Sequence, residues 1–347
     1  MVRTAWNQYS QNNRRYVFGR PESFVSLQLE RRPRMRVNLL CLGAIGLSSI
    51  VLAVTQRNGL FKKHGLEVQL IAVRGTAVPE FTTTNPIGHI GAPAAVMRAG
   101  TGADLRLIAS FDTSRLSNCL VVRPGINTRD QLRGKRLGAR VAGAAMWIHT
   151  VIALEALGLD RIQDRISIAE IGDPSEIIRA LEAGAIDGAV LARAQCEQLT
   201  RQGCSILLDL SPLDVYGAPD ALVVTAHFLN QNPDVAAAVL AGLIEGAAFA
   251  LSPNKRPAVL EAIKSEMRIT DNAIAECALH DLSRVLARKP YPSVERLRNM
   301  QRIMLTANAR VLGVTIEGMV DDRFVRRLDE SGAIDRTYVS YGVPDPI

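Results

Sequence analysis

The sequence lacks the short motifs that mark many nucleotide, cofactor and metal sites. It has no phosphate-binding P-loop, no Rossmann glycine fingerprint and no Cys/His spacing typical of zinc. Its 5 cysteines are odd in number and form no CxxC pair, which argues against a complete disulfide framework. We therefore expect no cofactor and no metal.

The cysteines are better explained as packing residues. Cys41, Cys119 and Cys277 have apolar neighbours and are predicted to be small core residues. A bridge between Cys196 and Cys204 is the alternative for the other two, and it would need an exported, oxidising location.

The chain also lacks a basic surface beyond its first residues. Of its 41 basic and 34 acidic side chains, residues 1–36 hold eight arginines and two glutamates, which leaves 33 basic and 32 acidic ones. The body is therefore close to neutral and shows no sign of a nucleic-acid partner. The polar, arginine-rich residues 1–35 are predicted to form a solvated, disordered leader.

A long uninterrupted apolar segment is missing as well. The apolar run at residues 39–54 contains Gly43, Gly46, Ser48 and Ser49, which suit a membrane span poorly. An export signal is the competing interpretation, because basic residues precede this run. We favour the first strand and helix of a folded domain, which leaves the chain without a clear signal peptide.

What the sequence does contain is a strand–helix–strand unit over residues 37–72. Val37–Leu42 predicts a strand and Leu47–Arg57 a helix, and Gly59 suits the end of that helix. Apolar and polar residues then alternate over Leu66–Leu70, as in a half-buried strand. Later strands alternate with helices, which indicates βαβ units and largely parallel sheets.

Several segments together resemble one known family. GLFKKHGLEVQL at residues 59–70 looks like the first unit of periplasmic solute-binding proteins of the SsuA/THI5/NMT1-like group. The resemblance continues at 74–76 (RGT), 91–94 (GAPA), 120–125 (LVVRPG), 130–139 (DQLRGKRLGA), 179–191 (RALEAGAIDGAVL), 288–293 (RKPYPS) and 324–335 (FVRRLDESGAID). The order and spacing of these segments are more specific than any one of them.

The resemblance implies a two-lobed α/β fold of the type 2 periplasmic-binding-protein kind. Each lobe would be a mostly parallel sheet flanked by helices. The first lobe would comprise residues 36–122 and 220–347, and the second residues 123–219. We also expect a short helix at Ala77–Thr83 and a single one at Phe324–Asp335.

Small-residue loops at the predicted strand ends mark a candidate ligand cleft. In open α/β sheets ligands bind beyond the carboxyl ends of the strands, where helix N-termini suit anions. The resemblance implies that the corresponding loops line the cleft. The expected ligand contacts are Gly46, Leu47, Ser48, Arg74, Gly75, Thr76, Ala92, Pro93, Ser110, Gly143, Ala144 and Arg193.

These contacts have simpler explanations beside them. Arg74 and Arg193 are the cationic candidates, and an ordinary surface position is the alternative for each. The hydroxyls of Ser48 and Thr76 are candidates for hydrogen bonds to a ligand, with helix capping as the alternative.

The resemblance implies the solute-binding component of an ABC-type importer. The solute would be small and anionic or heterocyclic, like a sulfonate, taurine, nitrate or a pyrimidine, and a membrane permease would receive it. We expect a monomer, periplasmic by resemblance, with a cytoplasmic location left open. The alternative is an enzyme on the same fold, a pyrimidine synthase or a desulfinase. His89 would be its acid–base group, and a core histidine is the other interpretation of that residue.

Overall fold

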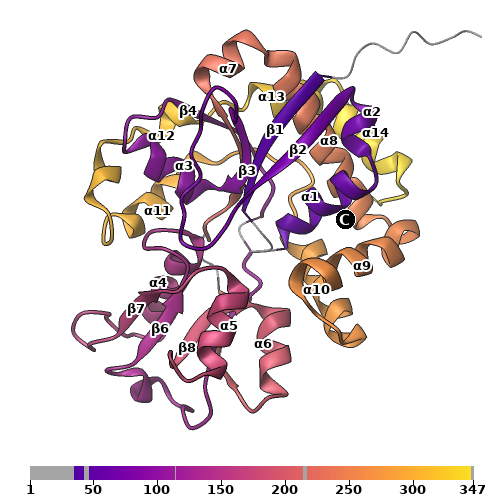
Figure 1. The fold of residues 1–347 in the computed structure, drawn as a ribbon. Coiled ribbons are helices and arrows are strands. Elements are labelled where there is room, and N and C mark those ends of the chain that lie inside the picture. Colours follow the sequence, from indigo (N-terminus) through magenta and orange to yellow (C-terminus); the bar gives the residue numbers. More distant parts are fainter. Residues whose placement is uncertain (1–34, 43–46, 114, 214–216, 345–347) are drawn as a thin grey trace, which may run out of the picture. The chain divides into compact units, whose positions relative to one another are not determined.

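The computed structural model describes residues 35–42, 47–113, 115–213 and 217–344. The predicted leader lies outside the described residues except for Met35, which begins the first strand. The described chain builds two five-stranded sheets, each surrounded by helices (Figure 1). We call the parts of the chain around them the first lobe and the second lobe.

In the first sheet four strands run in one direction and one runs against them. Its order is β2 (Leu66–Val73), β1 (Met35–Leu42), β3 (Ile87–Gly91), β10 (Asp220–Thr225) and β4 (Leu105–Ser110). β1 pairs in parallel with β2 and β3, whereas β10 is antiparallel to β3 and β4. Leu42 lies opposite Val73, so β1 and β2 end together and Arg74 leaves the sheet at its carboxyl edge.

The second sheet repeats this arrangement. Its order is β7 (Ser167–Glu170), β6 (Arg136–Ala139), β8 (Gly188–Ala192), β5 (Asn118–Val122) and β9 (Ser205–Asp209). β6 pairs in parallel with β7 and β8, whereas β5 is antiparallel to β8 and β9. The predicted fold class, two lobes built on mostly parallel sheets, is confirmed.

The position of β5 corrects the expected lobe boundary. The sequence placed residues up to 122 in the first lobe, but Asn118–Val122 pairs inside the second sheet. An apolar run predicts a buried strand, but it does not say which sheet the strand joins.

Helices flank both sheets and most of them belong to the first lobe. The first lobe has α1 (Ser48–Arg57), α2 (Leu60–Lys63), α3 (Ala92–Ala99), α7 (Ala226–Gln231), α8 (Pro233–Leu251), α9 (Arg256–Met267), α10 (Asn272–Val285), α11 (Val294–Met304), α12 (Ile316–Met319), α13 (Arg323–Glu330) and α14 (Ala333–Ser340). The second has α4 (Ala145–Ala156), α5 (Pro174–Glu182) and α6 (Arg193–Thr200). Short 3-10 helices lie at Arg129–Leu132, Pro253–Lys255 and Ala309–Gly313.

The predicted strand–helix–strand unit is present as β1, α1, α2 and β2. Gly59 adopts a left-handed conformation, with φ of 64°, between the two helices, as its role at a helix end requires. In β2 Leu66 and Val68 are buried whereas Glu67 and Gln69 are exposed, which is the predicted alternation. The unit places the end of β1 and the start of α1 at the carboxyl edge of the sheet.

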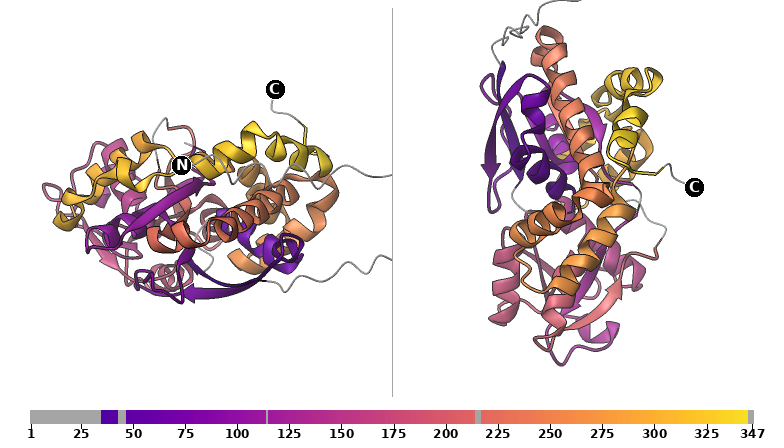
Figure 2. Two further views of the ribbon diagram at one scale, coloured as in Figure 1. Left: turned by 90° about the horizontal axis from the view of Figure 1, so that it is seen from above. Right: turned by 90° about the vertical axis from the view of Figure 1, so that its right-hand side faces the viewer.

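The long helix α8 forms much of the core of the first lobe. By length and composition it could span a membrane, but 67% of its apolar window is buried inside the fold. It packs against α1, α2 and α14, and the right-hand view of Figure 2 shows it running beside the first sheet. Length and apolar composition alone do not distinguish a buried core helix from a membrane span.

The helix expected at Ala77–Thr83 does not form. The backbone carbonyls that such a helix would use internally are bonded instead to arginine side chains. Arg98 donates to the carbonyl oxygens of Pro79 and Val78 at 2.6 and 2.7 Å, and Arg140 donates to that of Ala77 at 2.7 Å.

The chain end and one cysteine also differ from expectation. The single helix predicted at Phe324–Asp335 is divided into α13 and α14 by Gly332, whose φ is 70°. Cys277 is exposed on α10, whereas Cys41 and Cys119 are buried as predicted. Cys196 and Cys204 are free thiols, so the alternative bridge between them is not formed.

Candidate functional site

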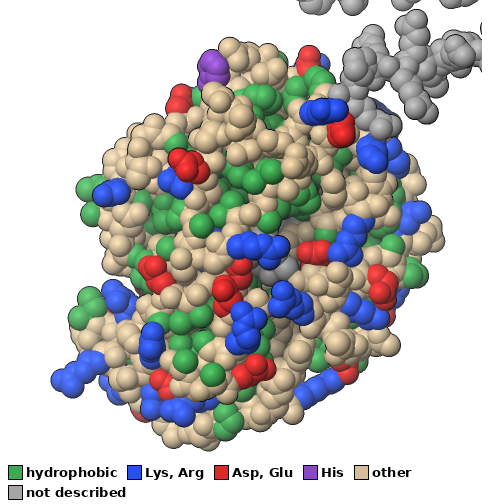
Figure 3. All heavy atoms as spheres, in the orientation of Figure 1, with side chains coloured by type: hydrophobic (Ala, Val, Ile, Leu, Met, Phe, Trp, Pro, Cys, Tyr) green, Lys and Arg blue, Asp and Glu red, His purple; other side chains and the backbone are tan. Residues whose placement is uncertain are grey.

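A cavity of about 570 Å³ lies between the lobes at the carboxyl ends of their strands, and we call it the interlobe cavity. The first lobe lines it with the ends of β1 and β2, one face of α1 and the end of α9. The second lobe lines it with α5 and α6. In Figure 3, Lys and Arg side chains, interspersed with Asp and Glu, border the hollow between the lobes on the face shown.

The floor of the cavity comes mainly from α1 and carries both apolar and polar side chains. Leu52 and Ala53 line it together with Ser49 and Gln56, and their spacing of three and four residues places them on one helix face. Leu42, Leu70 and Met267 extend this surface. Cys41 at the end of β1 also lines the cavity and is only 7% exposed.

Both carboxylates that line the interlobe cavity are already paired. Glu266 accepts from Arg57 at 2.6 Å, and Ser265 accepts from the same guanidinium at 2.9 Å. Asp173 lies 3.3 Å from Nε of Arg140, a buried arginine behind the cavity wall. The two acidic groups therefore neutralise two arginines and no more.

Three further arginines at the cavity have no such partner. Arg74 follows β2, Arg179 lies on α5 and Arg268 ends α9, and all three are exposed. Among the residues that the structure describes, none of these three side chains has a hydrogen bond or an ion pair. The cavity therefore carries an uncompensated positive charge contributed by both lobes.

A cluster of polar contacts joins the lobes beside this cavity, and we call it the interlobe clasp. Asp173 accepts from the backbone N–H of Gly75 at 3.0 Å and pairs with Arg140, which in turn reaches the carbonyl of Ala77. β6 and β7 end together, because Ala139 lies opposite Glu170, and this brings Arg140 and Asp173 to the same edge. Burial lowers the pKa of the Arg140 guanidinium, and the charge of Asp173 opposes that effect.

Asp173 has a second role as the N-cap of α5. Its carboxylate accepts from the backbone N–H three residues on, and the carboxylate of Glu176 accepts from the N–H of Asp173 at 2.8 Å. This capping box satisfies the first turn of the helix. An anionic solute would therefore have to compete with Asp173 for the backbone N–H groups of that turn. The arginine side chains of the cavity are more accessible to it.

A smaller cavity of about 90 Å³, the inner cavity, lies where the chain passes between the lobes. Leu47, Asp112, Ala145, His149 and Ala192 are among its lining residues. Burial and then the nearby charge of Asp220 raise the pKa of Asp112 to about 8. Burial lowers the pKa of His149 to about 4, and its Nε2 accepts from the N–H of Ala218 at 3.1 Å, so this ring is neutral.

The structure separates the contacts predicted from the sequence. Arg74 lines the interlobe cavity, Leu47 lines the inner cavity, and the N–H of Gly75 is engaged by the clasp. Thr76 is exposed after β2, whereas Ser110 is buried and its hydroxyl has no partner among the described residues.

Four other predicted contacts, all among the described residues, line neither cavity. Ala92 and Pro93 are buried at the start of α3, and Gly143 and Ala144 lie just before α4. Gly46 and the side chain of Ser48 fall outside the described residues.

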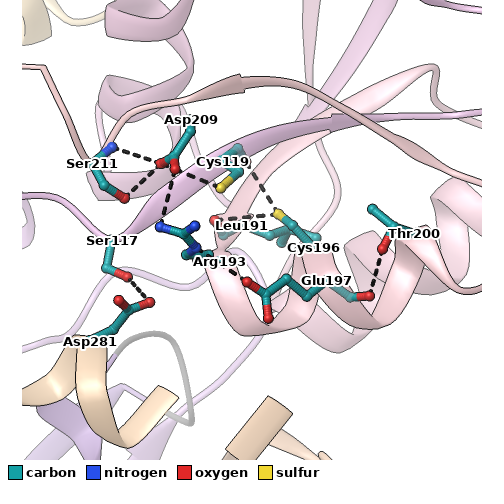
Figure 4. A network of polar contacts seen from close by, with 10 residues as sticks. All are labelled: Ser117, Cys119, Leu191, Arg193, Cys196, Glu197, Thr200, Asp209, Ser211 and Asp281. Carbon is teal, nitrogen blue, oxygen red and sulfur yellow. Dashed lines mark hydrogen bonds and ion pairs between the residues drawn. The ribbon is translucent and has the colours of Figure 1, made fainter. Parts of the chain in front are cut away.

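Arg193 is held within the second lobe rather than pointing into either cavity. Its guanidinium lies 3.2 Å from Glu197 and 3.2 Å from Asp209 (Figure 4). Asp209 also accepts from the hydroxyl of Ser211 at 2.6 Å. A solute could reach Arg193 only by displacing these carboxylates.

Most of the charged groups at the cavity were not predicted from the sequence. The predicted contacts lie mainly in loops, whereas Arg57, Arg179 and Arg268 lie on helices or at a helix end. The spacing of the α1 face would have shown which side of that helix is available. The capping box of α5 would have drawn attention to Asp173.

His89 lies within the first sheet and lines neither cavity. On β3 it stands opposite Cys41 on one side and Leu222 on the other. Its ring packs edge-on against Phe111 at 5.3 Å, and its Nε2 has no partner among the described residues. Burial lowers its pKa, so the ring is neutral.

Comparisons with known proteins agree with this architecture. A family model described as NMT1/THI5 like matches residues 48–256. The search of curated proteins found no match. The chain is similar to a protein of Bordetella bronchiseptica RB50, at 16% identity and a TM-score of 0.72, over 87% of this chain and 99% of that one.

Two further solved structures differ from each other in function. The alkanesulfonate-binding protein SsuA from Xanthomonas axonopodis pv. citri, bound to MOPS, has 15% identity and a TM-score of 0.66 over 84% of this chain and 99% of its own. The desulfurization enzyme DSZB has 15% identity and a TM-score of 0.60 over 86% of this chain and 99% of its own. Identities this low indicate a shared fold, and the fold carries both binding and catalysis.

Proposed function

The chain belongs to the NMT1/THI5-like family, as its sequence predicted, and on this premise we propose that it is the solute-binding component of an ABC-type importer. The observation that carries the proposal is the interlobe cavity. Both lobes line it, and three of its arginines have no opposite charge among the described residues.

The solute of this proposal is a small organic anion. The uncompensated arginines favour a carboxylate or a sulfonate, both of which accept paired hydrogen bonds from a guanidinium. A volume of about 570 Å³ is within the range of small-molecule sites and far exceeds a single inorganic ion such as nitrate. The apolar side chains of the α1 floor suit a hydrocarbon body, and the alkanesulfonate bound by SsuA is of this general kind.

Binding would work through closure of the lobes around the solute. A ligand shifts such an equilibrium only by as much as it binds the closed form better than the open one. Groups of both lobes must therefore touch it, and α1, Arg74 and Arg268 face α5 and Arg179 across the cavity. Delivery to a membrane permease, a monomeric state and a periplasmic location are proposed on the family alone.

The enzyme alternative gains no support from its own candidate residue. The proposed acid–base group, His89, is buried in the first sheet and lines neither cavity. Nucleophile and base must converge on a site that a substrate can reach. DSZB shows that the fold can carry an enzyme, and the experiment below therefore includes that outcome.

The proposal is tested by native mass spectrometry of the purified protein, followed by thermal-shift screening against sulfonates, carboxylates and pyrimidines. We expect an organic anion to co-purify or to raise the melting temperature, and to be recovered unchanged. Recovery of a chemically altered compound would contradict the binding role and indicate an enzyme.

A further inference from the structure

The uncompensated arginines of the interlobe cavity are divided between the two lobes. Arg74 and Arg268 belong to the first lobe, at the end of β2 and the end of α9. Arg179 belongs to the second lobe, on α5. A single acidic group bound by Arg179 would leave the two arginines of the first lobe without an opposite charge. A single acidic group bound by the first lobe would likewise leave Arg179 without one.

The two carboxylates that line the cavity do not supply the missing charge. Glu266 is engaged by Arg57, and Asp173 is engaged by Arg140 and by the N–H of Gly75. Breaking either pair to reach another arginine would leave a second positive charge without a partner. An acidic solute can therefore pair with the three arginines without displacing a carboxylate of the cavity.

Part of the cavity lining is apolar. Leu52, Ala53 and Met267 are buried there, and Leu70 and Ile178 of the second lobe also line the cavity. An apolar segment is stabilised there by removal from water, at about 25 cal/mol per Å². Acidic groups placed directly against these apolar side chains would lose hydration without gaining a donor.

We propose that the solute is an organic dianion whose two acidic groups are separated by an apolar body. One group binds Arg179 of the second lobe, and the other binds Arg74 and Arg268 of the first. This inference rests on the proposed solute-binding function. A dianion of this kind connects the lobes through both of its ends, so its binding favours the closed form more strongly than binding of a monoanion does.

The test compares α,ω-dicarboxylates of increasing chain length with monocarboxylates of the same length, by isothermal titration calorimetry on the full chain. We expect the best dicarboxylate to bind about tenfold more tightly than its matched monocarboxylate, because it gains a further charge-assisted contact. An optimum in chain length is expected, since the two groups of arginines are a fixed distance apart in the closed form.

Three variants locate the contacts. Arg179→Gln is expected to reduce dicarboxylate affinity about tenfold while leaving monocarboxylate affinity within about twofold. The double variant Arg74→Gln/Arg268→Gln is expected to weaken both classes. Arg136→Gln is the matched control, because Arg136 is exposed in the second lobe but does not line the cavity, and it is expected to change neither affinity.

Two results would overturn the inference while the proposed function stands. They are equal affinity for dicarboxylates and monocarboxylates in the unaltered protein, and an equal loss of both in Arg179→Gln. If no organic anion binds at all, while the chain is folded by circular dichroism, both this inference and the proposed function are overturned.

Discussion

At the scale of single residues, the site depends on which charges already have partners. Arg57 and Arg140 are held by carboxylates, whereas Arg268 is exposed and has no described partner. Arg268 also closes α9 with a left-handed backbone, at φ of 55°, where a side chain is disfavoured. Arginine in this conformation lowers the stability of the fold relative to glycine at the same position.

Arg268→Gly separates stability from binding. Glycine relieves the left-handed conformation, so we expect the free energy of unfolding to stay the same or rise by about 1 kcal/mol. Loss of the guanidinium is expected to weaken binding of organic anions about tenfold. Urea denaturation and calorimetry measure the two effects. A marked loss of stability would contradict the account, because it would mean that the side chain packs against the fold.

Asp112 at the inner cavity predicts a pH dependence. Its pKa in the folded chain, about 8, lies above the ordinary value of 3.8, so the folded state holds the proton more tightly than the unfolded chain does. This contribution to stability is complete below about pH 4 and is lost as the pH rises through about 8.

Asp112→Asn keeps the shape of the side chain and removes its titration. We expect it to flatten the loss of stability between about pH 4 and 8, measured by urea denaturation at a series of pH values. The exposed Asp104→Asn is the control and should leave the profile unchanged. A profile of Asp112→Asn that matches the parent protein would contradict the assignment.

At the scale of elements, the clasp connects the loop after β2 to the N-terminus of α5. Asp173 caps the helix, neutralises Arg140 and accepts from the first lobe. Asparagine is as good an N-cap as aspartate, but it carries no charge. Replacing Asp173 by asparagine therefore separates the contribution of the N-cap to stability from that of the ion pair.

Asp173→Asn is expected to lower the free energy of unfolding by about 2–3 kcal/mol, because Arg140 is left buried without its counter-charge. Glu176→Gln in the same capping box should cost little, since glutamine also completes the box. Thermal and urea denaturation provide the comparison. Equal small losses in both variants would show that the ion pair contributes little to holding the lobes.

The sequence predicted elements well where the signal was local. The alternation of apolar and polar residues identified the strand β2, and the glycine after α1 identified the end of that helix. Both signals are local, because side-chain periodicity and a left-handed backbone depend on neighbouring residues only. The sheet that β5 joins depends on pairings with β8 and β9, which lie far away in sequence. The missing helix at residues 77–83 depends on Arg98 and Arg140 for the same reason.

At the scale of the whole molecule, the site arises from separate parts of the chain. Loops at strand ends were predicted to form it, yet Arg179 and Arg268 come from helices of different lobes. Composition could not reveal this charge, because residues 37–347 are nearly neutral in total. In the folded chain some arginines lie together at one cavity, whereas other basic side chains form ion pairs elsewhere.

That gathering predicts a salt-dependent affinity. Attraction between exposed charges is screened over about 8 Å at physiological ionic strength and over about 3 Å at 1 M salt. We expect anion binding to weaken as sodium chloride is raised, and dianion binding to weaken more steeply than monoanion binding. Calorimetry over a salt series measures both slopes. Affinities that do not change with salt would contradict an electrostatic site.

The most direct test of the account uses Cys41 as a reporter on the floor of the interlobe cavity. Burial, reinforced by Glu266 and opposed by Arg74, raises the pKa of its thiol, so alkylation in the free protein is slow. Cys277 is exposed on α10 and serves as an internal control.

The measurement is the rate of iodoacetamide labelling at each cysteine, read by peptide mass spectrometry with and without an organic anion that raises the melting temperature. We expect the anion to slow labelling of Cys41 severalfold and to leave that of Cys277 unchanged. An anion that stabilises the protein without protecting Cys41 would show that the solute binds elsewhere, and would contradict the assignment of the interlobe cavity.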